Sequence, residues 1–186
     1  MQPLGHYTFM KYTSAGVVAS LAVASLVTAC APQPRKAAFN ESAFVPYAGS
    51  GSSTVKGTAY TVLRDNKNER VATSSAVVKL VPANEYTDEI VERRYYNRTK
   101  LEQADPRYQK YVRRTHPDDD GHFVFSHVPA GSYYVSSHLH WSYESSYTDD
   151  NGTIWPTTIP VDQWIYAKVA VGKGQTADVE DWVQGK

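Results

Sequence analysis

The sequence predicts an all-β sandwich of about seven strands with one short α-helical insertion. Three observations support this fold class. Short runs rich in Val, Thr, Tyr and Phe recur from residue 54 onward. Turn residues separate these runs at the spacing expected of a β-sandwich. Only residues 86–114 lack β alternation and instead concentrate Glu, Arg, Lys and Gln.

The first 29 residues have the organisation of a secretory signal peptide. Lys11 provides a positive charge, and residues 15–27 form an uncharged apolar run followed by small residues. This run is too short for a membrane-spanning helix, which needs about 20 residues. Cys30 is the only cysteine and directly follows Val-Thr-Ala at 27–29. This order resembles the lipobox of bacterial lipoproteins, in which the cysteine is acylated and becomes the mature N-terminus.

The lipobox resemblance implies a protein anchored in the cell envelope by several acyl chains, because a single chain binds a membrane only marginally. Ala31 stands where an aspartate favours inner-membrane retention, which indicates the outer membrane, facing the periplasm. Cleavage would leave residues 30–186, the length of one domain. An incidental thiol beside an uncleaved helix is the alternative interpretation of Cys30.

Residues 30–53 are predicted to be a flexible tether. Pro, Gly and Ser dominate both ends of this segment, and no periodicity runs through it. A short apolar patch formed by Phe39, Phe44, Val45 and Tyr47 offers a means of docking onto the domain. The domain itself is expected over residues 54–186.

Within the domain, six strands are predicted from β-prone runs bounded by turn residues. In the third strand, Phe123 and Phe125 alternate with Val124 and Ser126, so the two phenylalanines share one face. A turn at 65–68 closes the first strand and Pro82 closes the second. The six strands cover residues 55–63, 75–81, 122–128, 132–141, 164–171 and 177–183.

Residues 86–114 are predicted to be a helical insertion between two strands. Thr87 is the expected N-cap, because acidic residues follow it in the first turn. Pro106 interrupts the helical pattern, and a second short turn is expected around 108–112. The insertion carries eight Lys/Arg against five Asp/Glu and five of the fourteen tyrosines.

Tyrosine and arginine are favoured in interface cores. The candidate partner contacts in the insertion are therefore Arg93, Arg94, Tyr95 and Tyr96. The alternative is a helix that simply covers one sheet edge.

Three segments of the predicted sandwich match a known signature. Residues 57–59 read Gly-Thr-Ala, residues 120–125 read Asp-Gly-His-Phe-Val-Phe, and residues 128–135 read Val-Pro-Ala-Gly-Ser-Tyr-Tyr-Val. Together with Val-Ala-Val-Gly-Lys-Gly-Gln at 169–175, they resemble the carboxypeptidase regulatory-like domain. The resemblance implies a prealbumin-like (transthyretin-like) sandwich without catalytic residues, because the matched positions have packing roles.

A long loop is predicted from residue 142 to residue 162. Its aromatic residues are mixed with Asp, Asn, Gln and Thr, as in surfaces that bind sugars or peptides. The alternative is that the rings cap the open end of the sandwich. The aromatic residues in the loop and at its edges are Trp141, Tyr143, Tyr147, Trp155 and Trp164.

Two groups of possible metal ligands occur in the sequence, and neither favours a metal site. His138 and His140 share one strand face about 7 Å apart and would need a third ligand such as Glu144; the alternative is a pair of surface histidines. Residues 118–120 are all aspartate, but they lack the ligand spacing of an EF-hand and are better interpreted as a solvated turn. We therefore predict no metal and no cofactor.

The residue inventory limits the function classes. Nineteen Lys/Arg balance nineteen Asp/Glu, which argues against nucleic-acid binding. No Gly-x-Ser-x-Gly motif is present, and no carboxylate pair is identifiable as acid and base, so an enzyme is not expected. We expect a membrane-anchored, non-catalytic lipoprotein that binds an envelope protein or a glycan. The alternatives are a carbohydrate-binding module, because prealbumin-like sandwiches resemble starch-binding folds, and an anchoring subunit of a secretion or surface assembly.

Overall fold

The computed structural model describes residues 31–63, 69–72, 76–97, 99–180 and 182–184. The predicted signal peptide, Cys30 and the predicted turn at 65–68 lie outside these residues. The chain from Pro32 to Lys186 forms one compact unit. Across the described ranges, no helix has the length and apolar character needed to span a membrane.

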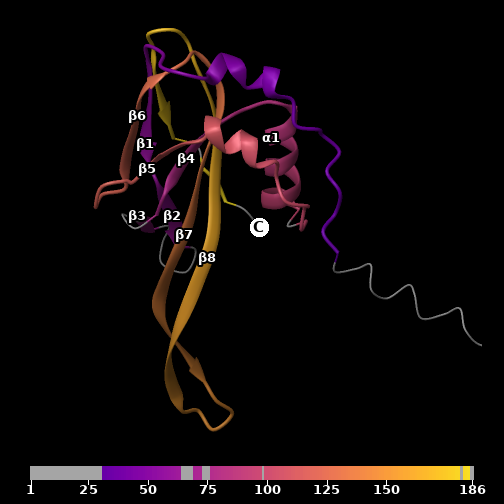
Figure 1. Ribbon diagram of the computed structural model, residues 1–186. Coiled ribbons are helices and arrows are strands. Elements are labelled where there is room, and N and C mark those ends of the chain that lie inside the picture. Colours follow the sequence, from indigo (N-terminus) through magenta and orange to yellow (C-terminus); the bar gives the residue numbers. More distant parts are fainter. Residues whose placement is uncertain (1–30, 64–68, 73–75, 98, 181, 185–186) are drawn as a thin grey trace, which may run out of the picture. The chain divides into compact units, whose positions relative to one another are not determined.

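Two β-sheets pack face to face to form a sandwich (Figure 1). In the first sheet, β1 pairs antiparallel with β6 and parallel with β9. In the second sheet, the strand order is β10-β8-β7-β4-β5 and all pairs are antiparallel. The first sheet consists of β1 (Ser53–Thr58), β6 (His122–Val128) and β9 (Thr176–Val179). The second consists of β4 (Val78–Pro82), β5 (Arg113–Thr115), β7 (Gly131–Thr148), β8 (Ile154–Val171) and β10 (Val183–Gln184).

A separate ribbon pairs β2 (Tyr60–Leu63) with β3 (Glu69–Ala72). The predicted β-sandwich is confirmed, with eight described strands in its two sheets where about seven were expected. The third predicted strand, residues 122–128, coincides with β6. β3, β5 and β10 were not predicted, because they have two to four residues and such short runs show no measurable alternation.

The hydrophobic core lies between the two sheets. Phe123 and Phe125 point inward from β6, as their alternation predicted, and both are buried. Leu80 of β4, Leu139 of β7 and Ile165 of β8 face them and are fully buried. Burying one such side chain contributes about 1.5–3 kcal/mol, so this layer stabilises the fold in the absence of any disulfide among the described residues.

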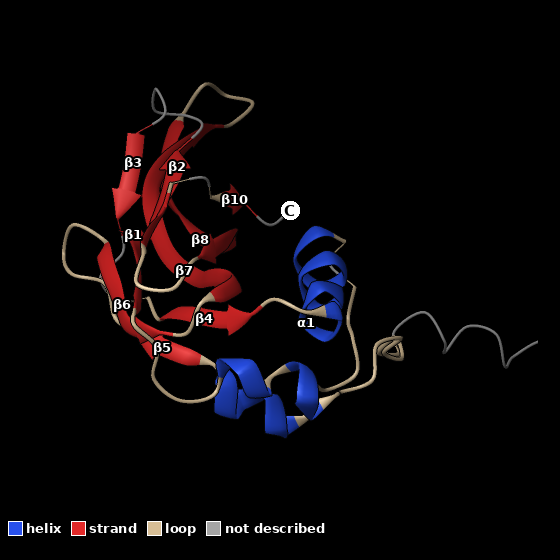
Figure 2. Cartoon of the chain, turned by 90° about the horizontal axis from the view of Figure 1, so that it is seen from above, coloured by secondary structure: helices blue, strands red, loops and turns tan. Residues whose placement is uncertain are grey.

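The helical insertion covers the outer face of the five-stranded sheet (Figure 2). It consists of α1 (Glu85–Ile90), the π-helix η4 (Val91–Tyr96) and the 3-10 helix η5 (Pro106–Tyr111). The N-cap of α1 is Asn84, and the prediction of Thr87 was wrong by three residues. Thr87 occupies the N3 position of a capping box, in which its hydroxyl accepts from Asn84 N at 2.9 Å.

Residues 33–44 of the predicted tether pack onto the insertion through the apolar patch that the sequence offered for docking. Phe44 is fully buried against Tyr86 and Tyr111. The carboxylate of Glu89 accepts hydrogen bonds from Lys36 N at 2.9 Å and Ala37 N at 3.1 Å. The turns η2 (Glu41–Ala43) and η3 (Val45–Tyr47) lie in this segment. The Pro and Ser content suggested a free linker, but the apolar patch provides enough surface to dock.

The position of Tyr47 requires a glycine at position 131 of the sequence signature. Its ring packs edge-on against Tyr133, with centroids 5.1 Å apart. Gly131 has a φ of +156°, and a Cβ there would lie 2.6 Å from Tyr47 Cε1. The close approach of the N-terminal segment therefore requires glycine at position 131.

Candidate binding site

The predicted loop at 142–162 is instead a continuous β-hairpin, so that prediction was wrong. β7 and β8 have 18 residues each, and their pairing runs without interruption from Gly131↔Val171 to Thr148↔Ile154. β4 accompanies β7 only as far as Ser137. We call residues 140–162 the arm, because in the described chain no third strand pairs with this part of the hairpin (Figure 1).

The tip of the arm is a tight turn organised by Asp149. Its Oδ1 accepts from the backbone N–H groups of Asn151 and Thr153, each at 2.9 Å. Its Oδ2 accepts from Trp155 Nε1 at 3.0 Å. The Trp155 hydrogen bond, helped by those of the backbone, lowers the pKa of Asp149 below its usual value. The Asp149 carboxylate thus connects the turn backbone to the Trp155 indole.

The arm has an inner face that continues the core face of the sheet. Because side chains alternate along a strand, Leu139 in the core is followed on the same face by Trp141, Tyr143 and Tyr147. Tyr147 is directly opposite Trp155, and the two side chains are 58% and 48% exposed. The inner face comprises Trp141, Tyr143, Ser145, Tyr147, Trp155, Thr157, Ile159 and Val161.

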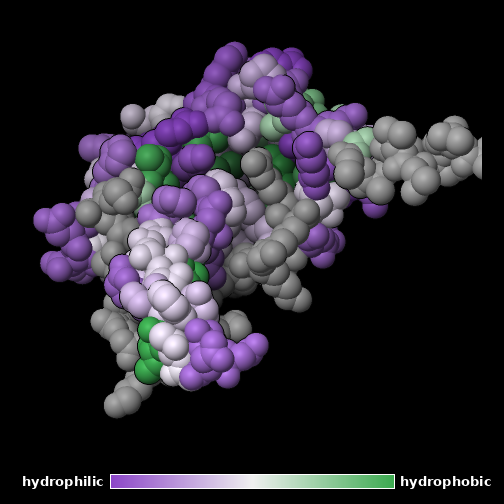
Figure 3. All heavy atoms as spheres, turned by 90° about the horizontal axis from the view of Figure 1, so that it is seen from below, coloured by the Kyte–Doolittle hydropathy of each residue, from purple (hydrophilic) through white to green (hydrophobic). Residues whose placement is uncertain are grey.

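Exposure along the inner face increases toward the tip. Trp141 is half-buried and packs against the core, and its ring lies 5.6 Å from that of Tyr143. Tyr147 follows Trp141 by six positions, a distance of about 20 Å along a strand. Figure 3 shows pale and green surface on the arm, bordered by hydrophilic purple atoms. By register, Trp141, Tyr143, Tyr147 and Trp155 share one face of the arm, and the last two are exposed near its tip.

The opposite face of the β7–β8 hairpin carries His138 and His140, which are weak metal-ligand candidates in the sequence. His138 stacks on Trp164 with ring centroids 4.3 Å apart, and its Nε2 contacts Asp162 Oδ1. Glu144 accepts a hydrogen bond from Thr158 Oγ1 instead of joining the histidines. Among described residues, the ligand atoms of His138 and His140 do not gather with a third donor within 4.8 Å.

Asp118, Asp120 and His122 do lie close together, with one ligand atom of each within 4.8 Å of the others. All three are exposed. Asp118 Oδ1 accepts from His122 N at 2.8 Å and from Asp120 N at 3.1 Å, and the His122 bond is the main cause of the lowered pKa of Asp118. Gly121 adopts a φ of +84°. These features are those of the solvated turn that the sequence predicted.

The candidate residues of the insertion are engaged within the protein where their side chains are described. Arg93 Nη1 donates to Glu89 Oε1 at 2.9 Å and to Pro34 O at 3.0 Å. Tyr95 stacks on Trp164 and Tyr166, with centroids 5.1 and 5.5 Å away. Arg94 and Tyr96 also belong to η4, but their side chains are not among the described ones. Among the described candidate side chains, Tyr147 and Trp155 of the arm are therefore more accessible than Arg93 and Tyr95 of the insertion.

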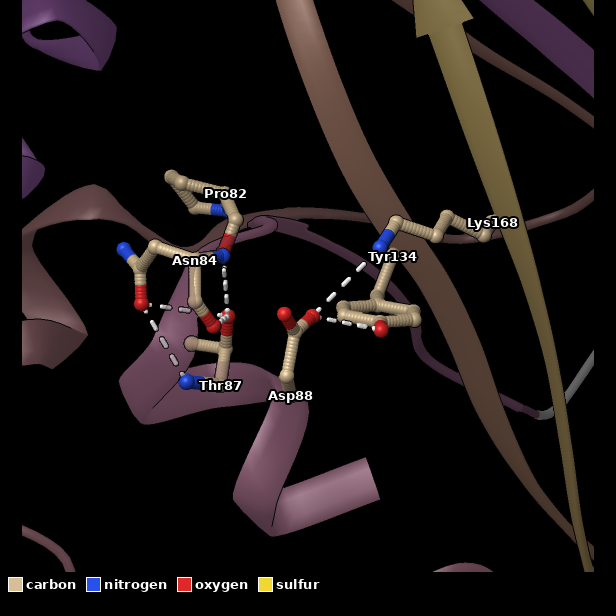
Figure 4. A network of polar contacts seen from close by, with 6 residues as sticks. All are labelled: Pro82, Asn84, Thr87, Asp88, Tyr134 and Lys168. Atoms are coloured by element: carbon tan, nitrogen blue, oxygen red, sulfur yellow. Dashed lines mark hydrogen bonds and ion pairs between the residues drawn. The ribbon is translucent and has the colours of Figure 1, made fainter. Parts of the chain in front are cut away.

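A polar network fixes the insertion to the sheet (Figure 4). Thr87 Oγ1 donates to Pro82 O at 2.7 Å. Asp88 Oδ1 accepts from Tyr134 Oη at 2.6 Å and from Lys168 Nζ at 3.5 Å. Sequence reasoning missed this network because Tyr134 and Lys168 are 46 and 80 residues from Asp88.

Comparisons with known proteins give a structural likeness only. No family model matches the chain, and no curated protein matches it. The fold is similar to the crystal structure of a "putative carbohydrate binding protein (PA1324)" from Pseudomonas aeruginosa, with a TM-score of 0.58 and 25% identity. The match covers 76% of this chain and 94% of that one. The domain is thus a β-sandwich of the same general architecture as that protein.

Proposed function

We propose that this protein is a non-catalytic carbohydrate-binding module whose glycan site is the inner face of the arm. The observation that carries this proposal is the exposed Tyr147–Trp155 pair at the end of a row of aromatic rings. The likeness to a protein described as carbohydrate-binding supports a glycan over an unspecified envelope partner. The internal engagement of Arg93 and Tyr95 weighs against the insertion as the binding surface.

The proposed binding mode is stacking of sugar rings on flat aromatic side chains. The C–H faces of a pyranose are apolar, and covering them with Tyr147 and Trp155 removes apolar surface from water. Asp149 holds the Trp155 ring in place, which reduces the entropy lost on binding. The hydroxyls of Ser145 and Thr157, on the same face, suit hydrogen bonds to sugar hydroxyls. A row of about 20 Å favours an extended oligosaccharide over a single sugar.

The proposal places this module in the cell envelope. A lipid on Cys30 would hold it at the outer membrane, facing the periplasm. We also propose that the sandwich is prealbumin-like, on the basis of the signature at 120–135. Cys30→Ser should release the protein from the membrane fraction without unfolding the domain. Mass spectrometry of the wild type should find the acyl chains. A Cys30→Ser protein that stays in the membrane, together with an unmodified wild-type cysteine, would contradict the anchor.

Glycan binding can be tested with the full chain and a panel of linear oligosaccharides of glucose, N-acetylglucosamine and xylose. A detergent without a sugar headgroup is required, because a glycoside detergent would compete. We expect at least one oligosaccharide to bind, and the double variant Tyr147→Ala/Trp155→Ala to weaken it about tenfold or more. Ile154→Ser is the matched control, because Ile154 is 68% exposed at the same tip but lies on the opposite face.

Two results would overturn the proposal. One is the absence of binding to every glycan of the panel. The other is equal binding by the wild type and by Tyr147→Ala/Trp155→Ala, which would remove the arm from the site. If the double variant instead fails to capture a protein from the envelope that the wild type captures, the arm binds protein and the glycan proposal is wrong.

A further inference from the structure

A cavity lies between the helical insertion and the outer face of the five-stranded sheet, on the side of the sheet opposite the core. Its volume is about 210 Å³, room for a ligand of about one ring. We call it the insertion pocket. Its lining includes Lys79, Ile90, Val91, Tyr95, Ser136 and Trp164.

The walls of the insertion pocket are aromatic and apolar. Tyr95 and Trp164 stack with centroids 5.1 Å apart and an interplanar angle of 22°. Tyr95 is supplied by the π-helix η4, a rare helix type that occurs frequently at functional sites. Ile90 and Val91 add aliphatic surface from the same side. Such walls favour a ligand with a flat or apolar ring.

The floor of the insertion pocket carries a cation beside a hydroxyl. Lys79 is the charged residue among the described residues that line it, and its Nζ lies 5.7 Å from the Trp164 ring centroid. Ser136 is directly opposite Lys79 in the β4–β7 register, so their Cβ atoms are about 5 Å apart on one face. Both side chains line the insertion pocket, so a carboxylate bound there can accept from the Lys79 ammonium and the Ser136 hydroxyl.

We propose that the insertion pocket binds a small six-membered-ring carboxylate. The ring would lie against the aliphatic wall of Ile90 and Val91, beside the Tyr95–Trp164 stack, and the carboxylate would accept from Lys79 Nζ and Ser136 Oγ. Both an aromatic acid and a sugar acid of the uronic type have this chemistry. The site is separate from the arm and does not depend on the arm binding a glycan.

The test is isothermal titration of the full chain with two matched pairs of probes. The pairs are 4-hydroxybenzoate against 4-hydroxybenzamide, and glucuronate against glucose, so that each anion has a neutral counterpart. At least one anion should bind at a single site with about tenfold higher affinity than its neutral counterpart, because hydrogen bonds to charged groups are worth about this factor. The pair that shows the preference identifies the source of the carboxylate.

Lys79→Met should abolish the preference for the anion, and Ser136→Ala should weaken it less. Lys168→Met is the matched control, because Lys168 is on the same sheet face but does not line the pocket. Tyr147→Ala/Trp155→Ala should leave the titration unchanged. The shift of the Trp164 indole N–H resonance should follow the titration and confirm the location. Near-ultraviolet circular dichroism verifies that each variant is folded.

The proposal is overturned if neither anion binds at its highest soluble concentration, or if anion and neutral probe bind equally. It is also overturned if Lys79→Met and Lys168→Met weaken binding equally, because that result would reflect general surface charge. Loss of glycan binding by the arm would leave the titration unaffected, so the two proposals can fail independently.

Discussion

The hairpin of β7 and β8 has two halves with the same alternating pattern, but the same face is buried in one half and exposed in the other. In the proximal half, Leu139 and Ile165 are fully buried under the three-stranded sheet. In the distal half, the arm, Tyr147 and Trp155 occupy the equivalent face and are about half exposed. The strands are continuous and the register does not change. The comparison teaches that alternation sets which side chains share a face, whereas the opposing layer decides whether that face is core or binding surface.

The largest expected effect comes from removing a buried side chain in the proximal half. Leu139→Ala should lower the free energy of unfolding by about 2–5 kcal/mol. Ile159→Ala, a truncation on the same face in the arm, should cost less than about 1 kcal/mol, because Ile159 is only partly buried. Urea denaturation of both variants measures the difference. Equal costs would mean that the arm is as tightly packed as the core.

The second-largest expected loss of stability comes from removing the carboxylate that binds the N-terminal segment. Burial acts to raise the pKa of Glu89, but hydrogen bonds from Lys36 N, Ala37 N and Arg93 outweigh it, so the pKa lies below 4.5. Glu89→Gln should cost about 1.5–3 kcal/mol at neutral pH, because bonds to a charged acceptor are lost. Glu92→Gln, at an exposed position in the same insertion, should cost little.

The sign of the pH dependence follows from the lowered pKa of Glu89. Its contribution to stability is complete above about pH 4.5, the pKa of the unfolded chain, and is lost as pH falls through the folded-state pKa. The stability difference between wild type and Glu89→Gln should therefore shrink below pH 4.5. A difference that stayed constant down to low pH would show that the charge of Glu89 does not hold the segment.

A smaller effect is expected at the junction between the insertion and the sheet. Thr87→Ala removes the capping-box hydroxyl and its hydrogen bond to Pro82 O, and should cost about 1–2 kcal/mol. Thr87→Ser keeps the hydroxyl and should recover most of this loss. Thermal unfolding by calorimetry distinguishes the two variants. A Ser variant as unstable as the Ala variant would assign the role to the methyl group.

The smallest effect on stability is expected at the tip of the arm. Tyr147→Ala/Trp155→Ala should change the free energy of unfolding by less than about 1 kcal/mol, because the two rings form one exposed cross-strand pair. The same variant is expected to lose glycan binding. A large loss of stability would mean that the pair supports the hairpin, and the binding role would need another test.

Several predictions from sequence depended only on local rules. The β6 strand and the solvated turn that contains Asp118 and Asp120 follow from alternation and turn chemistry. The length of β7 and β8 could not be predicted from these local rules. Ser, Thr and Pro dilute the apolar alternation of residues 142–162, and the pairing that stabilises them becomes evident only when both strands are aligned.

At the candidate binding surfaces, too, the sequence predicted part of the result and tertiary packing the rest. Sequence reasoning identified the aromatic residues of the arm and the tyrosines of the insertion, but not which of them remain accessible. Arg93 and Tyr95 are engaged by Glu89 and Trp164. The insertion pocket was missed entirely, because Lys79, Tyr95 and Trp164 come from separate parts of the chain and only packing brings them together.

Neighbouring residues were sufficient to predict the β-sandwich, the solvated turn at 118–120 and the aromatic residues of the arm. Only the folded chain shows where the N-terminal apolar patch docks, that one hairpin extends beyond the sandwich, and that a cavity lies beneath the insertion. These features depend on which surfaces meet across long separations in the chain. Contacts of that kind leave no local pattern, because each partner is chosen by shape and charge in three dimensions.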